Sequence, residues 1–305
     1  MSRFLQAGDT PPPGGGLQQG VLARRAFCCD LRLRLVSPSG TVTTLAGGGL
    51  NDTLAQPFGL ALDADGNVYL TELYGHKVTK IAPGPVVSTV AGSGSPSSVD
   101  GNGVNASFNE PVGIVFDAQG NLLVADSRGR KIRKITPAGE VSTFAGSGAP
   151  STVDGTGADA GFVMPAGIAI DAKGNLFVTE YGSNVIRKIT PQGVVSTPYG
   201  QIGVFGSVDG QGNGASFNRP VGIAIDSSGS LYVADSGSHA IRRITPDGMV
   251  RTLAGAGGGG ARDGVGAAAQ FNAPFGVAVD ASGNVYVADY GNHQIRKITP
   301  TPAVP

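Results

Sequence analysis

The stretch that decides the fold reads Pro-Val-Gly-Ile-Val-Phe-Asp over residues 111–117, and it continues after a short turn as Gly-Asn-Leu-Leu-Val-Ala-Asp over residues 120–126. This pattern occurs five times along the chain, and a proline opens each copy. A repeat of this length and strand-like composition indicates one supersecondary unit that recurs and buries its faces against its own copies. The opening prolines are Pro57, Pro111, Pro165, Pro220 and Pro274, so the copies begin 54, 54, 55 and 54 residues apart.

Each copy divides into four short extended segments. The first, such as Gly-Ile-Ala-Ile over residues 167–170, is almost entirely apolar, which predicts a strand buried on both faces. An Asp- and Gly-containing turn, as at residues 171–175, then leads into the second strand. The third strand carries Ile-Arg-Lys-Ile at residues 186–189, whose charges place it nearer the rim, and the fourth reads Val-Ser-Thr-Phe-Ala at residues 141–145. Four antiparallel strands per unit, repeated radially, predict an all-β protein with the β-propeller fold.

A long loop joins each fourth strand to the next unit, and it has a signature of its own. It reads Asp-Gly-x-Gly-x-x-Ala-x-Phe-x-x-Pro over residues 100–111, and the same spacing returns from Asp154, Asp209 and Asp263. We expect the phenylalanines of these loops to fill the gaps between neighbouring blades. They are Phe108, Phe162, Phe217 and Phe271.

The repeats resemble the NHL family, which is named for an Asn-His-Leu triplet near the start of the third strand. The nearest match is Asn-His-Gln at residues 292–294, and histidines recur at the same offset in residues 238–240 and 75–77. The resemblance covers roughly residues 31–300, because the proline, the glycine, the aspartates and the Ile-Arg-Lys-Ile block recur in register. It implies a propeller of six blades.

The number of blades depends on the N-terminal segment. Residues 33–47 match strands three and four of a unit ahead of the first clear copy, but the segment before them, residues 12–32, loses the strand pattern. We favour six blades with a degenerate first blade. Because the last copy stops after its third strand at Pro300, its fourth strand would then come from the N-terminus, with residues 3–7 as the candidate.

The alternative is a five-bladed propeller that closes when residues 41–46 pair beside residues 295–298. In either case we expect three parts. They are an irregular or degenerate N-terminal segment over residues 1–30, an NHL-type propeller over residues 31–300 and a tail over residues 301–305.

Composition restricts the class of protein and its partners. Hydrophobic residues make up 40% of the chain and charged residues 14%, which excludes disorder for most of it. Lysine plus arginine equals aspartate plus glutamate at 22 each, and this balance counts against nucleic-acid binding, which usually leaves a basic excess. The sequence has no apolar run of about 18 residues, so it predicts no membrane span.

The sequence does not determine the cellular compartment of the protein. No apolar stretch of signal-peptide length is visible at the N-terminus. An exported bacterial protein remains compatible with a truncated or misassigned N-terminus, and the two adjacent cysteines, Cys28 and Cys29, fit either a reduced or an exported setting.

We expect binding on the face where the loops between strands two and three emerge together with the inter-blade loops, because functional sites on such scaffolds sit on loops. Three of the five copies have a histidine at one equivalent position, and all five end the second strand with a carboxylate. Residues 197–205 break the repeat and add a tyrosine. The binding-face candidates are His76, His239, His293, Glu72, Asp126, Glu180, Asp235, Asp289, Tyr181 and Tyr199.

These candidates do not predict a catalytic residue or a metal ligand. A carboxylate present in every blade is most simply explained by a turn or by pairing with arginines such as Arg133. Histidines spread around a rim stand too far apart to share one metal ion at ligand distances of about 2 Å.

Two functions follow. The favoured one is a non-catalytic binding or scaffold propeller that presents its loop face to a protein, peptide or glycan. The alternative, implied by the resemblance to six-bladed enzymes, is a metal-dependent lactonase- or lyase-like propeller with a site at the channel mouth. Such an enzyme would use calcium, whereas the favoured reading implies no cofactor. The sequence does not decide whether the protein is an enzyme. We prefer the non-catalytic function because equivalent positions of the blades carry the same residue types, whereas an active site needs different residues that converge on one point.

Overall fold

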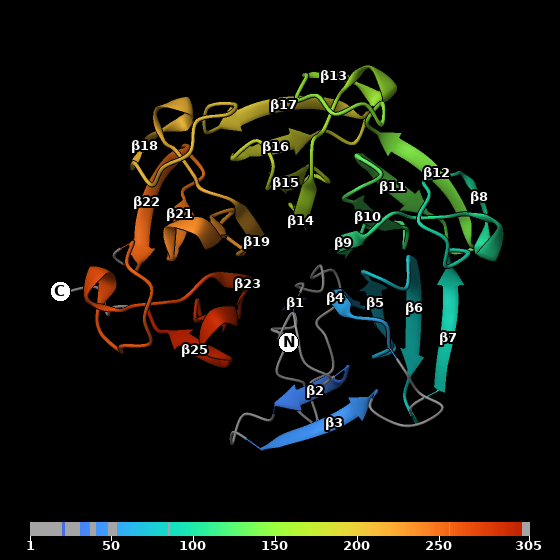
Figure 1. Cartoon of the computed structure of the whole chain (residues 1–305), viewed down its shortest axis with the longest axis horizontal. Helices are drawn as coiled ribbons and strands as arrows, with labels where there is room; N and C mark the ends of the chain where they lie inside the picture. The colour runs from blue at the N-terminus through green and yellow to red at the C-terminus, as the bar shows by residue number, and fades with distance from the viewer. Residues whose placement is uncertain are drawn as a thin grey trace.

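The computed structural model describes residues 20–21, 31–36, 41–47, 54–84, 86–255 and 257–300. These residues form antiparallel sheets arranged in a ring around a central axis (Figure 1). The first strand of each blade lies nearest the centre and the fourth lies outside. The described part of the chain contains no helix that is long and apolar enough to cross a bilayer.

The first two blades follow the predicted four-strand order. The strands of the first blade are β4 (Pro57–Leu62), β5 (Val68–Glu72), β6 (Lys77–Ala82) and β7 (Val86–Ala91). Those of the second are β9 (Pro111–Phe116), β10 (Leu122–Asp126), β11 (Lys131–Ile135) and β12 (Glu140–Ala145).

The remaining three blades repeat this order, except that the fifth has three strands. The third blade contains β14 (Pro165–Ile170), β15 (Leu176–Glu180), β16 (Val185–Ile189) and β17 (Val194–Tyr199). The fourth contains β19 (Pro220–Ile225), β20 (Leu231–Asp235), β21 (Ala240–Ile244) and β22 (Met249–Ala254). The fifth contains β23 (Pro274–Val279), β24 (Val285–Asp289) and β25 (Gln294–Ile298).

Short elements lie in the connections. Three two-residue strands from the inter-blade loops add to the outer edges of blades two, three and four, and they are β8 (Gly101–Asn102), β13 (Gly155–Thr156) and β18 (Gly210–Gln211). The 3₁₀ turns are η1 (Gly103–Asn105), η2 (Gly157–Asp159), η3 (Gly212–Gly214), η4 (Ser236–Ser238), η5 (Gly266–Ala268) and η6 (Tyr290–Asn292).

The described residues form five blades, so the favoured count of six is wrong and the five-bladed alternative is confirmed. Strands β2 (Leu33–Val36) and β3 (Val42–Ala46) do form, as their match to strands three and four predicted, but they pair with each other in a separate two-stranded sheet. The described residues of the degenerate stretch before them form β1 (Gly20–Val21), which pairs with the inner edge of β4.

The details of closure also differ from expectation. Strand β3 pairs with β2 and not with β25, so the pairing of residues 41–46 beside residues 295–298 does not occur. The alternative fourth strand at residues 3–7 lies outside the described residues. The boundary between residues 30 and 31 stays a prediction.

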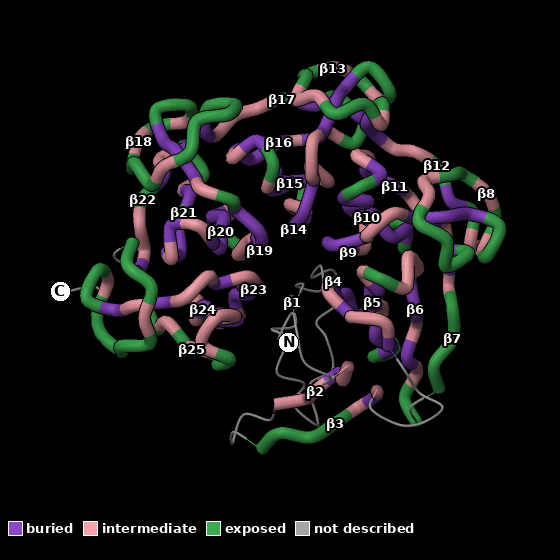
Figure 2. The backbone as a smooth tube through the Cα atoms, viewed as in Figure 1, coloured by how far each residue is buried: buried purple, intermediate pink, exposed green. Residues whose placement is uncertain are grey.

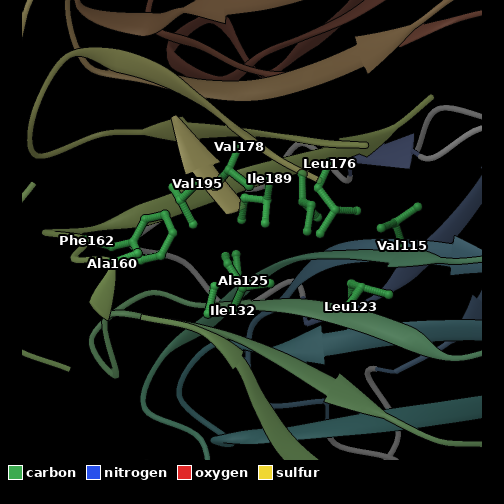
Figure 3. Close-up of a cluster of buried hydrophobic side chains, with 12 residues drawn as sticks. Val115, Leu123, Ala125, Ile132, Ala160, Phe162, Leu176, Val178, Ile189 and Val195 are labelled. Carbon is green, nitrogen blue, oxygen red and sulfur yellow. The ribbon is translucent and has the colours of Figure 1, made fainter. Parts of the chain in front are cut away.

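The hydrophobic core is divided among the contacts between neighbouring sheets. Figure 3 shows one cluster, in which Leu123 and Ala125 of the second blade face Val178 and Ile189 of the third. Phe162, from the loop between these blades, is fully buried in the same cluster. The prediction that the loop phenylalanines fill the gaps between blades is therefore confirmed.

Burial follows the distance from the axis (Figure 2). The inner strands β9, β14 and β19 are buried at five successive residues, as their apolar sequences predicted. The two-stranded sheet packs in the same way as a blade, because Leu33 and Ala46 join the core of the first blade.

Candidate functional site

The second-strand carboxylates lie inside the blades, where each of four meets an arginine from the third strand. In the third blade, Arg187 Nη1 donates to Glu180 Oε2 at 2.8 Å, and Nη2 donates to Asp154 Oδ1 at 3.0 Å. Arg187 Nη1 also donates to the carbonyl of Gly161 at 2.9 Å, and its guanidinium carbon lies 4.9 Å from the centre of the Phe162 ring. The planar guanidinium of Arg187 thus joins the second strand, the Asp-Gly loop and the Phe162 ring that fills the gap between the blades.

The same arrangement recurs in blades two, four and five. Its arginines are Arg133, Arg242 and Arg296, its second-strand carboxylates are Asp126, Asp235 and Asp289, and its loop aspartates are Asp100, Asp209 and Asp263. The second-strand carboxylates are fully buried, whereas the loop aspartates reach the surface. These four candidates therefore lie within the blades and do not line an open surface.

Burial changes the acidity of two of these carboxyl groups. It raises the pKa of Asp235 to about 6, although the N–H of Asn218 and the Arg242 guanidinium oppose the shift. Burial likewise raises the pKa of Asp126, against the opposing bonds from Ser98, Asn109 and Arg133.

Two of the three histidines link successive blades. His76 Nδ1 accepts the backbone N–H of Glu110 at 3.2 Å, and His239 Nδ1 accepts that of Ala273 at 3.0 Å. In the third blade, Asn184 Oδ1 accepts the N–H of Arg219 at 2.8 Å. All three acceptor residues have φ between 52° and 60°, the left-handed region that Asn and His tolerate better than most residues. His293 has the same backbone conformation in the fifth blade, where it is exposed.

The two tyrosine candidates contact different partners. The guanidinium of Arg219 lies 5.9 Å from the centre of the Tyr181 ring. Tyr199 ends β17 and is half-buried, and its pKa is raised by burial and by the negative charge of Asp247.

Sequence reasoning missed a set of apolar side chains that are exposed in the turns and inter-blade loops. One of them is Phe205, which is 74% exposed in the tract that breaks the repeat. The signal was available, since these apolar residues lie outside any strand pattern. The set is Tyr74, Val99, Val104, Val153, Ile202, Val204, Phe205, Val208 and Val265.

The first blade departs from the other four at the buried carboxylate. The register pairs Arg133 with Thr143 in the second blade and Thr79 with Thr89 in the first, so Thr79 occupies the arginine position. Glu72 Oε2 accepts the N–H of Ala55 at 2.6 Å. Its Oε1 accepts the Thr79 hydroxyl and lies 3.6 Å from Lys77 Nζ.

In the sequence, ten residues (47–56) separate β3 from β4, and 48–53 among them lie outside the described residues, whereas residues 92–110 separate β7 from β9 and contain the Asp-Gly segment. A cavity of about 650 Å³ opens beside Glu72. Its described lining residues are Ala55, Glu72, Gly75, Lys77, Thr89, Gly92, Ser93, Gly94 and Val104.

No group of three His, Cys, Asp or Glu side chains comes together as a metal site within the described ranges. The candidate carboxylates bond within their own blades, and His76 and His239 bond to the next blade. The arrangement is that of a β-propeller whose polar residues hold its blades and loops in place.

Comparison with known proteins agrees with this class. The family model for the NHL repeat matches residues 217–244 and 271–298. The chain is 29% identical over 262 residues to the chloroplastic protein SUPPRESSOR OF QUENCHING 1 of Arabidopsis thaliana, covering 80% of this chain and 25% of that protein. It is 29% identical over 283 residues to NHL repeat-containing protein 2 of Homo sapiens, covering 80% of this chain and 39% of that one. The chain thus spans less than half the length of these relatives, and it is a β-propeller that has NHL repeats at the matched residues.

Solved structures share the fold at low sequence identity. An auxiliary nutrient binding protein from Bacteroides thetaiotaomicron superposes with a TM-score of 0.67 at 18% identity, covering 93% of this chain and 68% of that one. Virginiamycin B lyase from Staphylococcus aureus superposes with a TM-score of 0.54 at 17% identity, covering 94% and 85%. One fold therefore serves a binding protein and a lyase, and the fold does not choose between them.

Proposed function

We propose that this propeller is a non-catalytic binding module whose loop face holds a protein, peptide or glycan partner. The observation that carries the proposal is the set of apolar side chains exposed in the inter-blade loops. Phe205 and Val265, each in such a loop, are 74% and 79% exposed. Exposed apolar side chains that form a patch mark protein interaction sites.

The loops are rigid enough to serve as a platform. Each loop aspartate in blades two to five bonds to a third-strand arginine, and His76, Asn184 and His239 fasten three of the loops to the preceding blade. A surface that is ordered before binding loses less conformational entropy when a partner docks.

The distribution of polar groups favours binding over catalysis. A catalytic centre requires unlike residues that converge on one point, whereas these carboxylates pair within their own blades. The fold shared with an auxiliary nutrient binding protein is compatible with ligand binding, and the fold shared with a lyase supplies no site residues. We therefore advance the binding function alone.

A pull-down with matched variants tests the proposal. We expect the immobilised wild-type protein to retain a partner that is lost when Phe205→Asp and Val265→Asp are combined. The control is Gln119→Asp, an exposed residue in the hairpin turn between β9 and β10, which lies at the opposite end of the blade. Equal retention by both variants, or turnover of a lactone substrate by the wild type but not by the loop-face variant, would contradict the proposal.

A further inference from the structure

We infer that the partner is a peptide segment in which an acidic side chain lies beside bulky apolar ones, and that its carboxylate pairs with Arg219. Its apolar side chains cover Ile202, Val204 and Phe205, which we call the apolar turn. The inference rests on the proposed binding function and adds the chemistry of the ligand. It concerns the junction of blades three and four, which lies within the continuous described range 86–255.

The apolar turn distinguishes this junction from the preceding one. Phe205 forms an isolated backbone bridge to the phenylalanine that fills the next gap between blades, and Pro150 forms the equivalent bridge one copy earlier. A large aromatic side chain therefore replaces a proline at this position. Ile202, Val204 and Phe205 are 55%, 45% and 74% exposed, and they lie within four residues of one another along the chain. They thus form a local apolar patch that nothing in the described structure covers.

Three hydrogen bonds hold the apolar turn in place. The N–H of Gly203 donates to the carbonyl of Ser183 at 3.0 Å, and the N–H of Gly206 donates to the carbonyl of Phe217 at 3.0 Å. Ser238 Oγ donates to the carbonyl of Gly206 at 3.3 Å. The loop is therefore bonded to a turn of blade three and to a turn of blade four. A surface ordered in this way loses less conformational entropy when a ligand docks.

Arg219 supplies a positive charge at the same junction. Its backbone N–H donates to Asn184 Oδ1 at 2.8 Å, and its guanidinium carbon lies 5.9 Å from the centre of the Tyr181 ring. Both partners belong to the turn over residues 181–184, and this turn also bonds the apolar turn through Ser183. The charge and the apolar patch therefore share one support.

The guanidinium of Arg219 has no carboxylate within 4.0 Å among the described residues, and its side chain is exposed. Blade two shows how a charge at this position is otherwise neutralised. There Glu110 precedes the opening proline, as Arg219 does in blade four, and it pairs with Arg128 at 3.1 Å. The residue of blade four equivalent to Arg128 is Gly237, which carries no charge. A ligand carboxylate would therefore meet no internal competitor.

An acidic side chain between apolar ones complements this surface. A planar guanidinium binds a carboxylate through parallel hydrogen bonds, and the Tyr181 ring beside it restricts its motion before pairing. Neighbouring apolar side chains of the ligand would remove the apolar turn from water. A single cation on a chain of zero net charge does not suit a nucleic-acid backbone, so a peptide carboxylate is the favoured anion.

Titration of the isotope-labelled full chain with blocked pentapeptides, followed by amide chemical shifts, tests the inference. The first peptide has a glutamate between two leucines, the second has glutamine in place of glutamate, and the third has serines in place of the leucines. We expect the first peptide to shift the amides of Ser183, Gly203 and Gly206. The second should bind about threefold to fivefold more weakly, as the loss of one exposed ion pair predicts. The third should bind about tenfold more weakly, because it buries less apolar area.

Two variants and a control assign the two contacts. Arg219→Gln should weaken the glutamate peptide to the level of the glutamine peptide and leave the glutamine peptide unaffected, because the charge acts on the carboxylate. Phe205→Ser should weaken both of these peptides alike. The control, Arg251→Gln, removes an exposed arginine from strand β22 of blade four and should leave the binding of all three peptides unchanged.

The inference is overturned if the glutamate peptide does not bind, if it binds no better than the glutamine peptide, or if Arg219→Gln weakens both equally. The pull-down separates this failure from a failure of the proposed function. A partner that is lost from the Phe205 and Val265 variant but fully retained by Arg219→Gln would refute the inference and leave the proposed function standing. No retained partner, together with no chemical-shift change from any peptide, would refute both.

Discussion

Arg187 shows how one side chain can join three parts of a blade. Its guanidinium is fully buried, yet it bonds to Glu180, to Asp154 on the loop and to two backbone carbonyls. A buried charge of this kind costs desolvation free energy, which well-aligned partners offset. Removing one partner is therefore far more damaging than removing both.

We predict that Arg187→Met lowers the free energy of unfolding by roughly 3–5 kcal/mol, because it leaves the Glu180 carboxylate buried without a counter-ion. Urea unfolding followed by circular dichroism measures the change. The double variant Arg187→Met with Glu180→Leu should lose less than the single one. Lys173→Ala, at an exposed turn, is the control, and a loss no greater than that of this control would show that the pair is unimportant.

The acidity of Asp235 predicts a pH dependence. Its folded pKa of about 6 lies above the ordinary value of 3.8, so between about pH 4 and pH 6 the folded chain binds more protons than the unfolded chain. The contribution of this group to the free energy of unfolding therefore falls as the pH rises through that window. It is fully present below the window and lost above it.

Melting temperatures of the wild type and of Asp235→Asn, measured from pH 4 to pH 7, check this prediction. The advantage of the wild type over the variant should shrink toward about pH 6 and then stay constant, because asparagine does not titrate. Asp65→Asn serves as a control with the same change of charge at an exposed position. An advantage that grows with pH would contradict the raised pKa.

At the scale of elements, the turn between strands two and three fastens one blade to the next. The turn places His76, Asn184 or His239 in the left-handed region, and the side chain then reaches the residue before the next blade's opening proline. His and Asn both suit this position because each offers an acceptor and tolerates that backbone, whereas the second blade has Arg130 there, at a φ of 56°.

We predict that His239→Ala lowers the free energy of unfolding by about 1 kcal/mol, because the N–H of Ala273 loses its acceptor. The free energy of unfolding of His239→Asn should remain within about 0.5 kcal/mol of the wild type, since Asn184 accepts the equivalent backbone N–H in the third blade. Urea midpoints of the two variants decide the matter. Equal losses for Ala and Asn would mean that the imidazole itself is required, for a ligand or for packing.

At the scale of the whole molecule, each described core belongs to two neighbouring sheets. The cluster around Phe162 combines residues of blades two and three, and the cluster around Phe271 combines blades four and five. A single blade cannot bury its own faces, so the blades depend on one another for stability.

We predict that Phe162→Ala costs about 3–5 kcal/mol and lowers the stability of the described blades together. Hydrogen exchange should show protection falling in β20 of the fourth blade as well as in β10 and β15. Val153→Ala, a truncation of an exposed loop side chain, is the control. Loss of protection confined to blades two and three would show that the blades unfold independently.

Much of this fold was predictable from the sequence because its signals are local. Apolar runs such as residues 167–170 and the turns that begin at Asp117 or Asp171 predict strands and hairpins without knowledge of their neighbours. Pairing with third-strand arginines was one of the two explanations that the sequence offered for the recurring second-strand carboxylates, and the other was a turn. The number of blades did not, because a weak strand pattern cannot say whether its segment builds a sheet or pairs with an existing edge.

The sequence by itself determined the repeated blade, the phenylalanine plugs and the position of the loops, since these depend on spacing and side-chain chemistry within one copy. Only the tertiary structure decided that five blades form, that Phe205 stays exposed and that Glu72 differs from its four equivalents. The physical reason is that the burial of a side chain and the pairing of a strand depend on which residues other segments of the chain place beside it. Glu72 lines a cavity, and Thr79 stands at the position from which an arginine meets the carboxylate in the other four blades.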